Sequence, residues 1–232
     1  MSGRNVHSLV EIGHMIQLSN YKQNGYICLN GLELYDIQKN CLHKEETLKK
    51  SDACALANIA KEYHMDTVIF FEKHIFLIDN EHSDNIHNYE LHMPIEIVKD
   101  IDDIPEQYFE DLKKVVFIQD EEIVAKHYST IYEKVSPNYE IAMIERDWLE
   151  MNPYGCHKGK ALEKYVELRG LTMDDVIAFG NGGNDVSMLE KAGLGVAMGN
   201  AFDYVKEAAD DVCDDCDHDG IGKYLRKLME VS

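Results

Sequence analysis

The feature that most constrains the fold is a regular alternation of apolar and helix-like segments after Gly155. Short apolar runs at 176–179 and 194–198 are flanked by helical spacing, and Gly170 and Gly193 stand where helices would end. Strands that alternate with helices pair in parallel through right-handed crossovers. We therefore predict an α/β fold with a parallel sheet, whose chemistry gathers at the carboxyl ends of its strands. The helices expected here are 158–168, 185–191, 202–208 and 221–228, with a short strand at 211–213.

The start of the chain is predicted to belong to the same domain. Apolar residues recur at helical spacing over 6–16, and an apolar strand over 25–29 runs into a turn at Asn30 and Gly31. We expect residues 1–36 and 153–232 to form this core domain, and residues 37–152 to form an inserted α/β domain. The elements expected in the insert are a helix at 44–63, a hairpin of strands 67–71 and 74–78, an acidic linker containing Pro94 and Pro105, a strand at 115–118, a helix at 121–134, and strands at 140–144 and 148–151.

The charge of the chain argues against two classes of partner. Lys and Arg number 23 against 43 Asp and Glu, which gives a formal net charge of -20. So acidic a surface repels phosphate backbones and anionic lipid, so we expect no nucleic-acid or membrane partner. The start of the chain has no apolar stretch suited to a signal peptide, and the six cysteines are scattered. A reducing cytoplasm fits these features.

Two cysteines have the spacing of metal ligands. Cys213 and Cys216 are separated by two residues, but no second Cys or His pair stands at a matching distance. Acidic residues flank them. We favour a reduced pair closing a short strand over a zinc site.

The most informative segment is a glycine-rich turn at 178–189, AFGNGGNDVSML, between an apolar strand and a helix. It places carboxamide and carboxylate groups at a strand tip, and Asp185 also stands at a helix N-terminus, where an acidic side chain is stabilised. Such a turn suits a divalent cation or a phosphate. Taken by itself, it is equally well explained as a capped turn that uses Gly and Asn for their tolerance of positive φ.

The wider context of this turn resembles a known family. HKGKAL at 157–162, GVAMGNA at 195–201 and DHDGI at 217–221 occur in order with the turn, and Ser2-Gly3-Arg4 precedes a helix and the strand ending at Asn30. Together these motifs resemble the Cof-type phosphatases of the haloacid dehalogenase superfamily. The resemblance covers about 2–36 and 153–228, and the middle matches the inserted cap domain of that family. It implies a Rossmann-like parallel sheet with a cap.

The resemblance also implies roles for individual residues. Ser2, with Gly3 and Arg4 after it, would bind the transferring phosphoryl group, and Asn30 would lie near the substrate. Lys158 would steady the nucleophile and the developing phosphoryl charge. An isolated lysine at a helix start would otherwise be read as a solvated surface residue.

The glycine-rich turn would carry the remaining roles. Asn184 would fix the loop and Lys158, so Lys158, Asn184 and Asp185 are the expected catalytic residues. Asn181 and Asp185 match the metal-binding positions of the family, which uses Mg²⁺. Asn181 stands where the family places an aspartate, and an amide supplies no negative charge to a magnesium ion. We therefore expect weak or no metal binding.

The chain departs from the family in a second way. The family's nucleophile and acid/base partner are two aspartates at the tip of a first strand, followed by a Gly-Thr turn, and no such motif occurs in the sequence. The closest acidic runs, 100–103 and 214–219, read as solvated turns. The expectation is a sheet whose first strands are missing, with no evident nucleophile. A gap there would leave apolar faces and unpaired backbone groups, so self-association through the gapped sheet is expected as one outcome.

Two functions follow as alternatives. The first is a phosphohydrolase acting on a small phosphorylated metabolite, such as a sugar phosphate, that we expect to be inactive as this truncated chain. The second is a non-catalytic remnant, an anion-binding protein, or one half of a split enzyme.

Overall fold

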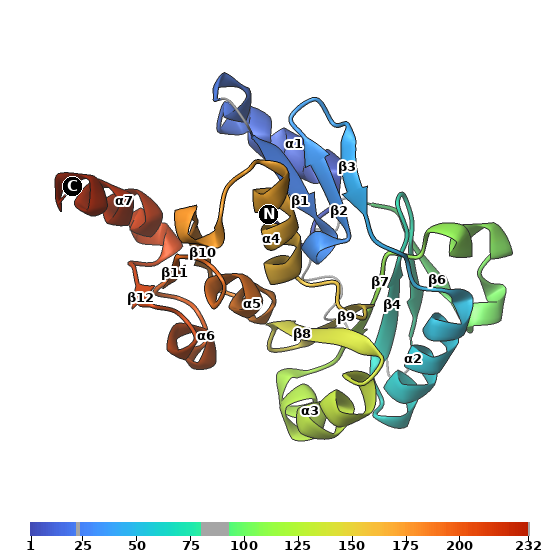
Figure 1. The fold of residues 1–232 in the computed structure, drawn as a ribbon. Coiled ribbons are helices and arrows are strands. Elements are labelled where there is room, and N and C mark those ends of the chain that lie inside the picture. The colour runs from blue at the N-terminus through green and yellow to red at the C-terminus, as the bar shows by residue number, and fades with distance from the viewer. Residues whose placement is uncertain (22–23, 80–92, 232) are drawn as a thin grey trace. The chain divides into compact units, whose positions relative to one another are not determined.

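The computed structural model describes residues 1–21, 24–79 and 93–231, and Figure 1 labels its elements. The chain divides into two compact units, each described by itself below. Unit 1 contains Met1–His43 and His157–Ser232, and unit 2 contains Lys44–Cys156. The predicted domain limits at 36/37 and 152/153 stay a prediction. None of the helices in the described ranges has the length and apolar character that crossing a membrane requires.

Unit 1 contains the predicted parallel strands. β10 (Ile177–Gly180) pairs in parallel with β11 (Leu194–Ala197), which pairs in parallel with β12 (Asp211–Val212). Four helices accompany them in sequence, namely α4 (Lys158–Leu168), α5 (Val186–Leu189), α6 (Asp203–Glu207) and α7 (Gly220–Val231). The predicted helix at 185–191 is shorter than expected: residues Gly183–Asp185 form a 3-10 turn before α5, and α5 ends at Leu189.

The N-terminal strand does not join this parallel sheet. After α1 (Val6–Met15), β1 (Gly25–Cys28) pairs in antiparallel register with β2 (Glu33–Asp36), and the sheet order continues to β3 (Cys41–Lys44). Strands β2 and β3 were not predicted from the sequence. Unit 1 therefore contains two separate three-stranded sheets, one antiparallel and one parallel. Within the described residues, no strand pairing joins these two sheets.

The core of unit 1 is divided accordingly. Ala178 and its neighbours from α5 and α6 pack on one face of the parallel sheet, whereas Val196, Met198 and Cys213 pack on the other. A third cluster joins Ile27 and Leu34 of the antiparallel sheet to α4. No single cluster among the described residues joins the two sheets.

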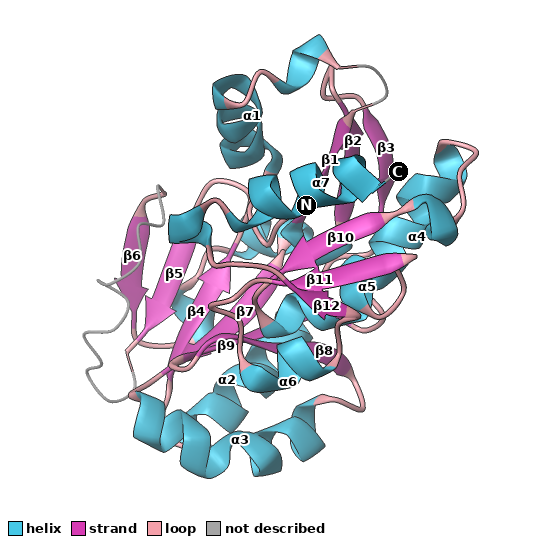
Figure 2. Cartoon of the chain, turned by 90° about the vertical axis from the view of Figure 1, so that its left-hand side faces the viewer, coloured by secondary structure: helices cyan, strands magenta, loops and turns pink. Residues whose placement is uncertain are grey.

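Unit 2 has one large core on a six-stranded sheet of order β6-β5-β4-β7-β9-β8. Figure 2 shows α2 and α3 on the same side of this sheet, and apolar residues of both helices are buried against it. The strands are β4 (Asp66–Phe70), β5 (Ile75–Ile78), β6 (Ile95–Val98), β7 (Lys114–Ile118), β8 (Tyr139–Glu145) and β9 (Trp148–Pro153), and the helices are α2 (Lys50–Glu62) and α3 (Glu121–Val135).

Two expectations for unit 2 were wrong. The helix predicted at 44–63 begins only at Lys50, because the preceding residues form the end of β3 and an extended segment whose Leu48 bridges to Leu112. The acidic linker around Pro94 and Pro105 contains strand β6, which pairs in parallel with β5. Part of that predicted linker, 80–92, lies outside the described residues. The predicted hairpin β4–β5 is confirmed in antiparallel register.

Candidate functional site

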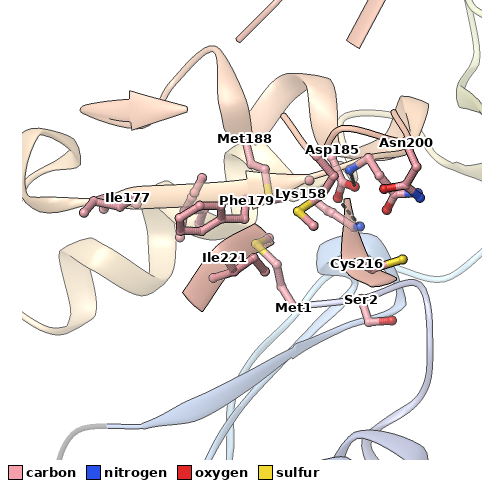
Figure 3. A pocket seen from close by; sticks show the side chains of 16 residues that line it. Met1, Ser2, Lys158, Ile177, Phe179, Asp185, Met188, Asn200, Cys216 and Ile221 are labelled. Atoms are coloured by element: carbon pink, nitrogen blue, oxygen red, sulfur yellow. Dashed lines mark hydrogen bonds and ion pairs between the residues drawn. The ribbon is translucent and has the colours of Figure 1, made fainter. Parts of the chain in front are cut away.

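The candidate site is a pocket of about 670 Å³ in unit 1, which runs along β10 to the carboxyl end of that strand. Figure 3 shows apolar side chains such as Ile177 toward one end of the pocket, and Lys158, Asp185 and Asn200 gathered at the other. This polar end stands where the sequence predicted the chemistry of a parallel sheet. The lining residues are Met1, Ser2, Lys158, Leu162, Val176, Ile177, Ala178, Phe179, Gly180, Asn181, Asp185, Met188, Met198, Asn200, Cys216 and Ile221.

A buried ion pair is the centre of the polar end. The ammonium Nζ of Lys158 donates a hydrogen bond to Oδ1 of Asp185 at 2.5 Å, and the two side chains are 7% and 8% exposed. Lys158 is the first residue of α4, whose preceding His157 caps the helix by accepting a hydrogen bond from the Lys160 N–H. This cap fixes the start of α4 and so places Lys158 toward the turn that carries Asp185. Two expected catalytic residues are thus brought together.

Asp185 also organises the glycine-rich turn. Its Oδ2 accepts hydrogen bonds from the backbone N–H groups of Asn181, at 2.9 Å, and Gly182, at 3.0 Å. Hydrogen bonds from two neighbouring backbone N–H groups hold the carboxylate in one orientation. The turn needs a glycine at 180, because a Cβ there would lie 2.4 Å from the Cβ of Asp185. The arrangement makes Asp185 a structural support for Lys158 as well as a candidate ligand.

The second contact across the site joins Asn30 to Asn184. Nδ2 of Asn184 donates to Oδ1 of Asn30 at 2.9 Å, and Asn30 is 2% exposed. Asn30 adopts the left-handed conformation at φ 55, which asparagine tolerates better than most residues. The two asparagines therefore connect the turn after β1 to the turn after β10. Neither belongs to the set of side chains that lines the pocket.

The N-terminal residues reach the same site by backbone hydrogen bonds. Ser2 N–H donates to the carbonyl of Ile27 at 3.0 Å, and Asn30 N–H donates to the carbonyl of Ser2 at 3.1 Å. Ser2 lines the pocket, and its Oγ accepts a hydrogen bond from the Arg4 N–H at 3.2 Å. Arg4 is exposed, and Gly3 and Arg4 fall outside the lining set. Of the three expected phosphate-binding residues, the structure thus places Ser2 on the pocket.

The environment of the pocket disfavours a second positive charge beside Lys158. Burial lowers the pKa of the Met1 α-amino group, and the nearby Lys158 ammonium lowers it further. Asp185 is the one acidic side chain among the described residues that line the pocket. An anion near Lys158 would be favoured by this distribution of charge.

The residues present do not by themselves fit a magnesium ion. No group of three or more His, Cys, Asp or Glu side chains among the described residues is arranged to hold a metal. Both carboxylate oxygens of Asp185 are engaged, with Lys158 and with two backbone N–H groups. Asn181 adds a neutral amide on the pocket wall. Magnesium sites depend on carboxylates to offset the cost of dehydration.

The cysteine pair is split between two environments. Cys213 is buried, its Sγ lies 3.5 Å from Sδ of Met198, and burial raises the pKa of its thiol. Cys216 is exposed and lines the pocket. Both are free thiols.

Two residues that sequence reasoning did not assign belong to the site. Asn200 lines the pocket just after β11, at one of the carboxyl strand ends where the chemistry of the sheet was predicted to gather, although no role had been assigned to it. Ser187 accepts a hydrogen bond from the Gly159 N–H at 3.0 Å. A Cβ at Gly159 would lie 2.2 Å from the carbonyl oxygen of Ser187. This close contact between α4 and α5 supports the position of Lys158.

The chain is similar in sequence to known phosphatases. A pyridoxal phosphate phosphatase of Escherichia coli, YbhA, is 29% identical over 205 residues, which cover 86% of this chain and 75% of that protein. A Bacillus subtilis phosphatase for 5-amino-6-(5-phospho-D-ribitylamino)uracil, YcsE, is 49% identical over 78 residues, which cover 34% of this chain. The chain thus spans 31% of YcsE, about a third of its length.

The fold of the chain is also similar to that of solved structures. A haloacid dehalogenase-like hydrolase from Bacteroides thetaiotaomicron aligns with a TM-score of 0.74 at 26% identity, covering 98% of this chain and 84% of that one. The family model for haloacid dehalogenase-like hydrolases matches residues 1–225. With the buried Lys158–Asp185 pair at the strand ends of a mixed α/β unit, this match shows that the chain belongs to the haloacid dehalogenase-like hydrolase family.

Proposed function

We propose that the chain binds the phosphoryl group of a small phosphorylated metabolite, such as a sugar phosphate, at the polar end of the pocket. The observation that carries this proposal is the buried Lys158 ammonium, held at the wall of the pocket by Asp185. A fixed ammonium in a partly dehydrated site attracts a phosphate dianion strongly. The Ser2 hydroxyl and the Asn200 amide line the same pocket and can add hydrogen bonds to phosphate oxygens.

The reaction class that this site serves is the hydrolysis of a phosphate monoester, as for the phosphatases that resemble the chain. Lys158 would hold the phosphoryl group and offset the charge that develops on it during transfer. Asp185 would keep the Lys158 ammonium in position and would fix the glycine-rich turn that contains Asn181. We propose that Asn184 and Asn30 act as positioning residues, because their mutual hydrogen bond connects the turns at the two strand ends.

We further propose that the described residues do not complete the reaction on their own. Asp185 is the one acid lining the pocket among them, and its two oxygens already accept hydrogen bonds from Lys158, Asn181 and Gly182. A carboxylate engaged in this way is poorly placed to attack phosphorus. No step through Mg²⁺ follows from these residues. The second candidate function, an anion-binding protein or one half of a split enzyme, is favoured by the same observation.

Ligand binding tests the shared part of both functions. Titration calorimetry with inorganic phosphate, a hexose phosphate and pyridoxal phosphate should give saturable binding to the chain, and Lys158→Met should abolish it. Lys191→Met is the matched control, because Lys191, in the turn after α5, forms an exposed ion pair with Glu163 of α4. Equal binding by the parent chain and Lys158→Met would contradict the proposal.

A further inference from the structure

Three asparagines in the chain, Asn24, Asn30 and Asn181, are followed directly by glycine. An asparagine in this position can lose its side-chain amide, because the next backbone nitrogen can attack the side-chain carbonyl carbon and glycine has no side chain to hinder it. The reaction closes a cyclic succinimide, which water opens to aspartate or isoaspartate. Its rate depends on whether the side chain is free to reach that nitrogen and whether a base can take the nitrogen's proton.

The fold restrains two of these three side chains by hydrogen bonds. Nδ2 of Asn24 donates to the carbonyls of Leu18, at 2.9 Å, and Tyr21, at 2.8 Å. Oδ1 of Asn30 accepts a hydrogen bond from Asn184 at 2.9 Å, and Asn30 is 2% exposed, which excludes the water that the reaction consumes. Each restraint must break before the side chain can turn toward the following nitrogen, so we expect both sites to react slowly.

Asn181 has a different environment. The residue is exposed and lines the pocket. Within the described ranges, its backbone N–H donates to Oδ2 of Asp185, and its side-chain amide makes no hydrogen bond to the chain. The carboxamide of Asn181 is therefore free to turn toward the nitrogen of Gly182, and water can reach the product of that step.

A base is already bonded to the reacting nitrogen. The backbone N–H of Gly182 donates to Oδ2 of Asp185 at 3.0 Å, within the range over which a general base takes a proton. The other oxygen, Oδ1, accepts a hydrogen bond from Lys158, which fixes the carboxylate in place (Figure 3). The N–H bond lies in the plane of the peptide, whereas the nitrogen attacks with electrons perpendicular to that plane. Asp185 can therefore take the proton without blocking the attack.

We propose that Asn181 is a self-modification site, at which Asp185 promotes the loss of the side-chain amide as ammonia. Oδ2 of Asp185 takes the proton of the Gly182 nitrogen, that nitrogen forms a bond to Cγ of Asn181, and the bond from Cγ to Nδ2 breaks. The leaving Nδ2 takes up the proton that Asp185 received, so ammonia departs and the carboxylate is regenerated. Water then opens the succinimide at either carbonyl carbon, which leaves aspartate or isoaspartate at position 181.

The product changes the charge of the pocket. A carboxylate at position 181 adds a negative charge to a wall on which Asp185 is the one acidic side chain among the described residues. The modified chain should bind inorganic phosphate at least about tenfold more weakly, because like charges repel. This consequence rests on the proposed function, in which Lys158 attracts a phosphate, whereas the modification itself does not.

Peptide mapping by mass spectrometry follows the modification directly. The full chain is incubated at neutral pH and digested at intervals, and deamidation raises the mass of the peptide that contains Asn181 by about 1 Da. In the folded chain Asn181 should react at least about tenfold faster than Asn24 and Asn30, whereas in urea the three should react at similar rates. If Asn181 reacts no faster in the folded chain than in urea, the fold supplies no catalysis and the proposal is overturned.

Asp185→Asn tests the base. An amide oxygen still accepts hydrogen bonds but is a very weak base, so the rate at Asn181 should fall at least about tenfold. Asp175→Asn is the matched control, because Asp175 accepts a backbone hydrogen bond from Thr172 at 2.9 Å in an exposed turn, and it should leave the rate unchanged. An unchanged rate in a folded Asp185→Asn variant would overturn the proposal.

Gly182→Ala keeps the test decisive if Asp185→Asn fails to fold. Gly182 has φ -98 and ψ 166, a conformation that alanine also adopts, so circular dichroism should show a folded variant. Its methyl group should slow ring closure at Asn181 while Asp185 stays in place, and reaction at the parent rate would overturn the proposal.

Calorimetry with inorganic phosphate distinguishes failure of this proposal from failure of the proposed function. Equal phosphate binding by the modified and unmodified chains would contradict the electrostatic consequence of the new carboxylate. Absence of phosphate binding in both would contradict the proposed function alone, because the mass change at position 181 is measured independently.

Discussion

Replacing Asp185 by alanine should destabilise unit 1 more than replacing its partner Lys158 by methionine. In Asp185→Ala the buried Lys158 ammonium loses the carboxylate to which it donates, and the N–H groups of Asn181 and Gly182 lose their acceptor. In Lys158→Met the carboxylate keeps both backbone donors, and the methionine side chain fills a similar volume. Comparing the two variants separates the free-energy cost of a buried Lys158 ammonium without its carboxylate from the cost of an Asp185 carboxylate that keeps its backbone hydrogen bonds.

The expected magnitudes follow from burial. Breaking a buried ion pair by removing one partner costs about 3–5 kcal/mol, and side chains that are 7% and 8% exposed meet that condition. We expect Asp185→Ala to lower the free energy of unfolding by an amount in that range. Lys158→Met should cost about 1–3 kcal/mol, the size of a lost hydrogen bond to a charged group. The exposed pair of Lys191 and Glu163 is the control, and Glu163→Ala should cost about 0–1 kcal/mol.

Urea unfolding followed by far-ultraviolet circular dichroism measures these free energies. The single tryptophan, Trp148, lies in unit 2, so its fluorescence follows that unit separately. We expect Asp185→Ala to move the circular-dichroism transition and to leave the fluorescence transition in place if the units unfold independently. A cost below about 1 kcal/mol for Asp185→Ala would refute the reasoning, since the pair would then behave like a surface ion pair.

Three further predictions follow from individual residues. The chain should show no Mg²⁺-dependent turnover of p-nitrophenyl phosphate, and Asn181→Asp should produce neither turnover nor a Mg²⁺-dependent shift in Tm; turnover that Asp185→Ala abolishes would contradict this. Gly180→Ala should cost about 1–3 kcal/mol in urea unfolding, because its Cβ would lie 2.4 Å from the Cβ of Asp185, and an unchanged midpoint would show that the turn relaxes freely. Burial, and then hydrogen bonds to Asp52 and Asp211, raise the pKa of Tyr139 and Tyr224 from 10.0 to about 12, so spectrophotometric titration should show both ionising late. Because the pKa of each tyrosine is higher in the folded state, the stabilisation that its protonated hydroxyl gives to the fold is fully present below pH 10.0 and is lost as the pH rises toward 12. Normal titration of both tyrosines would disprove the two hydrogen bonds.

The elements with strong local periodicity could be predicted from the sequence. The helix predicted at 121–134 occurs at Glu121–Val135, and the hairpin of β4 and β5 has the expected antiparallel pairing. β6 was not predicted. Its residues are mostly exposed and follow Pro94, and it is a strand because it pairs with β5. An edge strand has one neighbour and weak patterning of its own, so its existence depends on a contact that the local sequence does not encode.

For the site, the sequence by itself determined the chemical groups: a lysine at a helix start, and a glycine-rich turn that ends in asparagine and aspartate after an apolar strand. Only the tertiary structure decided which groups meet. Lys158 bonds to Asp185 across 27 residues, and Asn184 bonds to Asn30 across 154. The tertiary structure also decided that β1 pairs with β2 in antiparallel register, and that β10 pairs with β11 in a separate parallel sheet. The physical reason is that local patterns fix which segments become helices or strands, whereas pairing between distant segments depends on how all the apolar surfaces pack together.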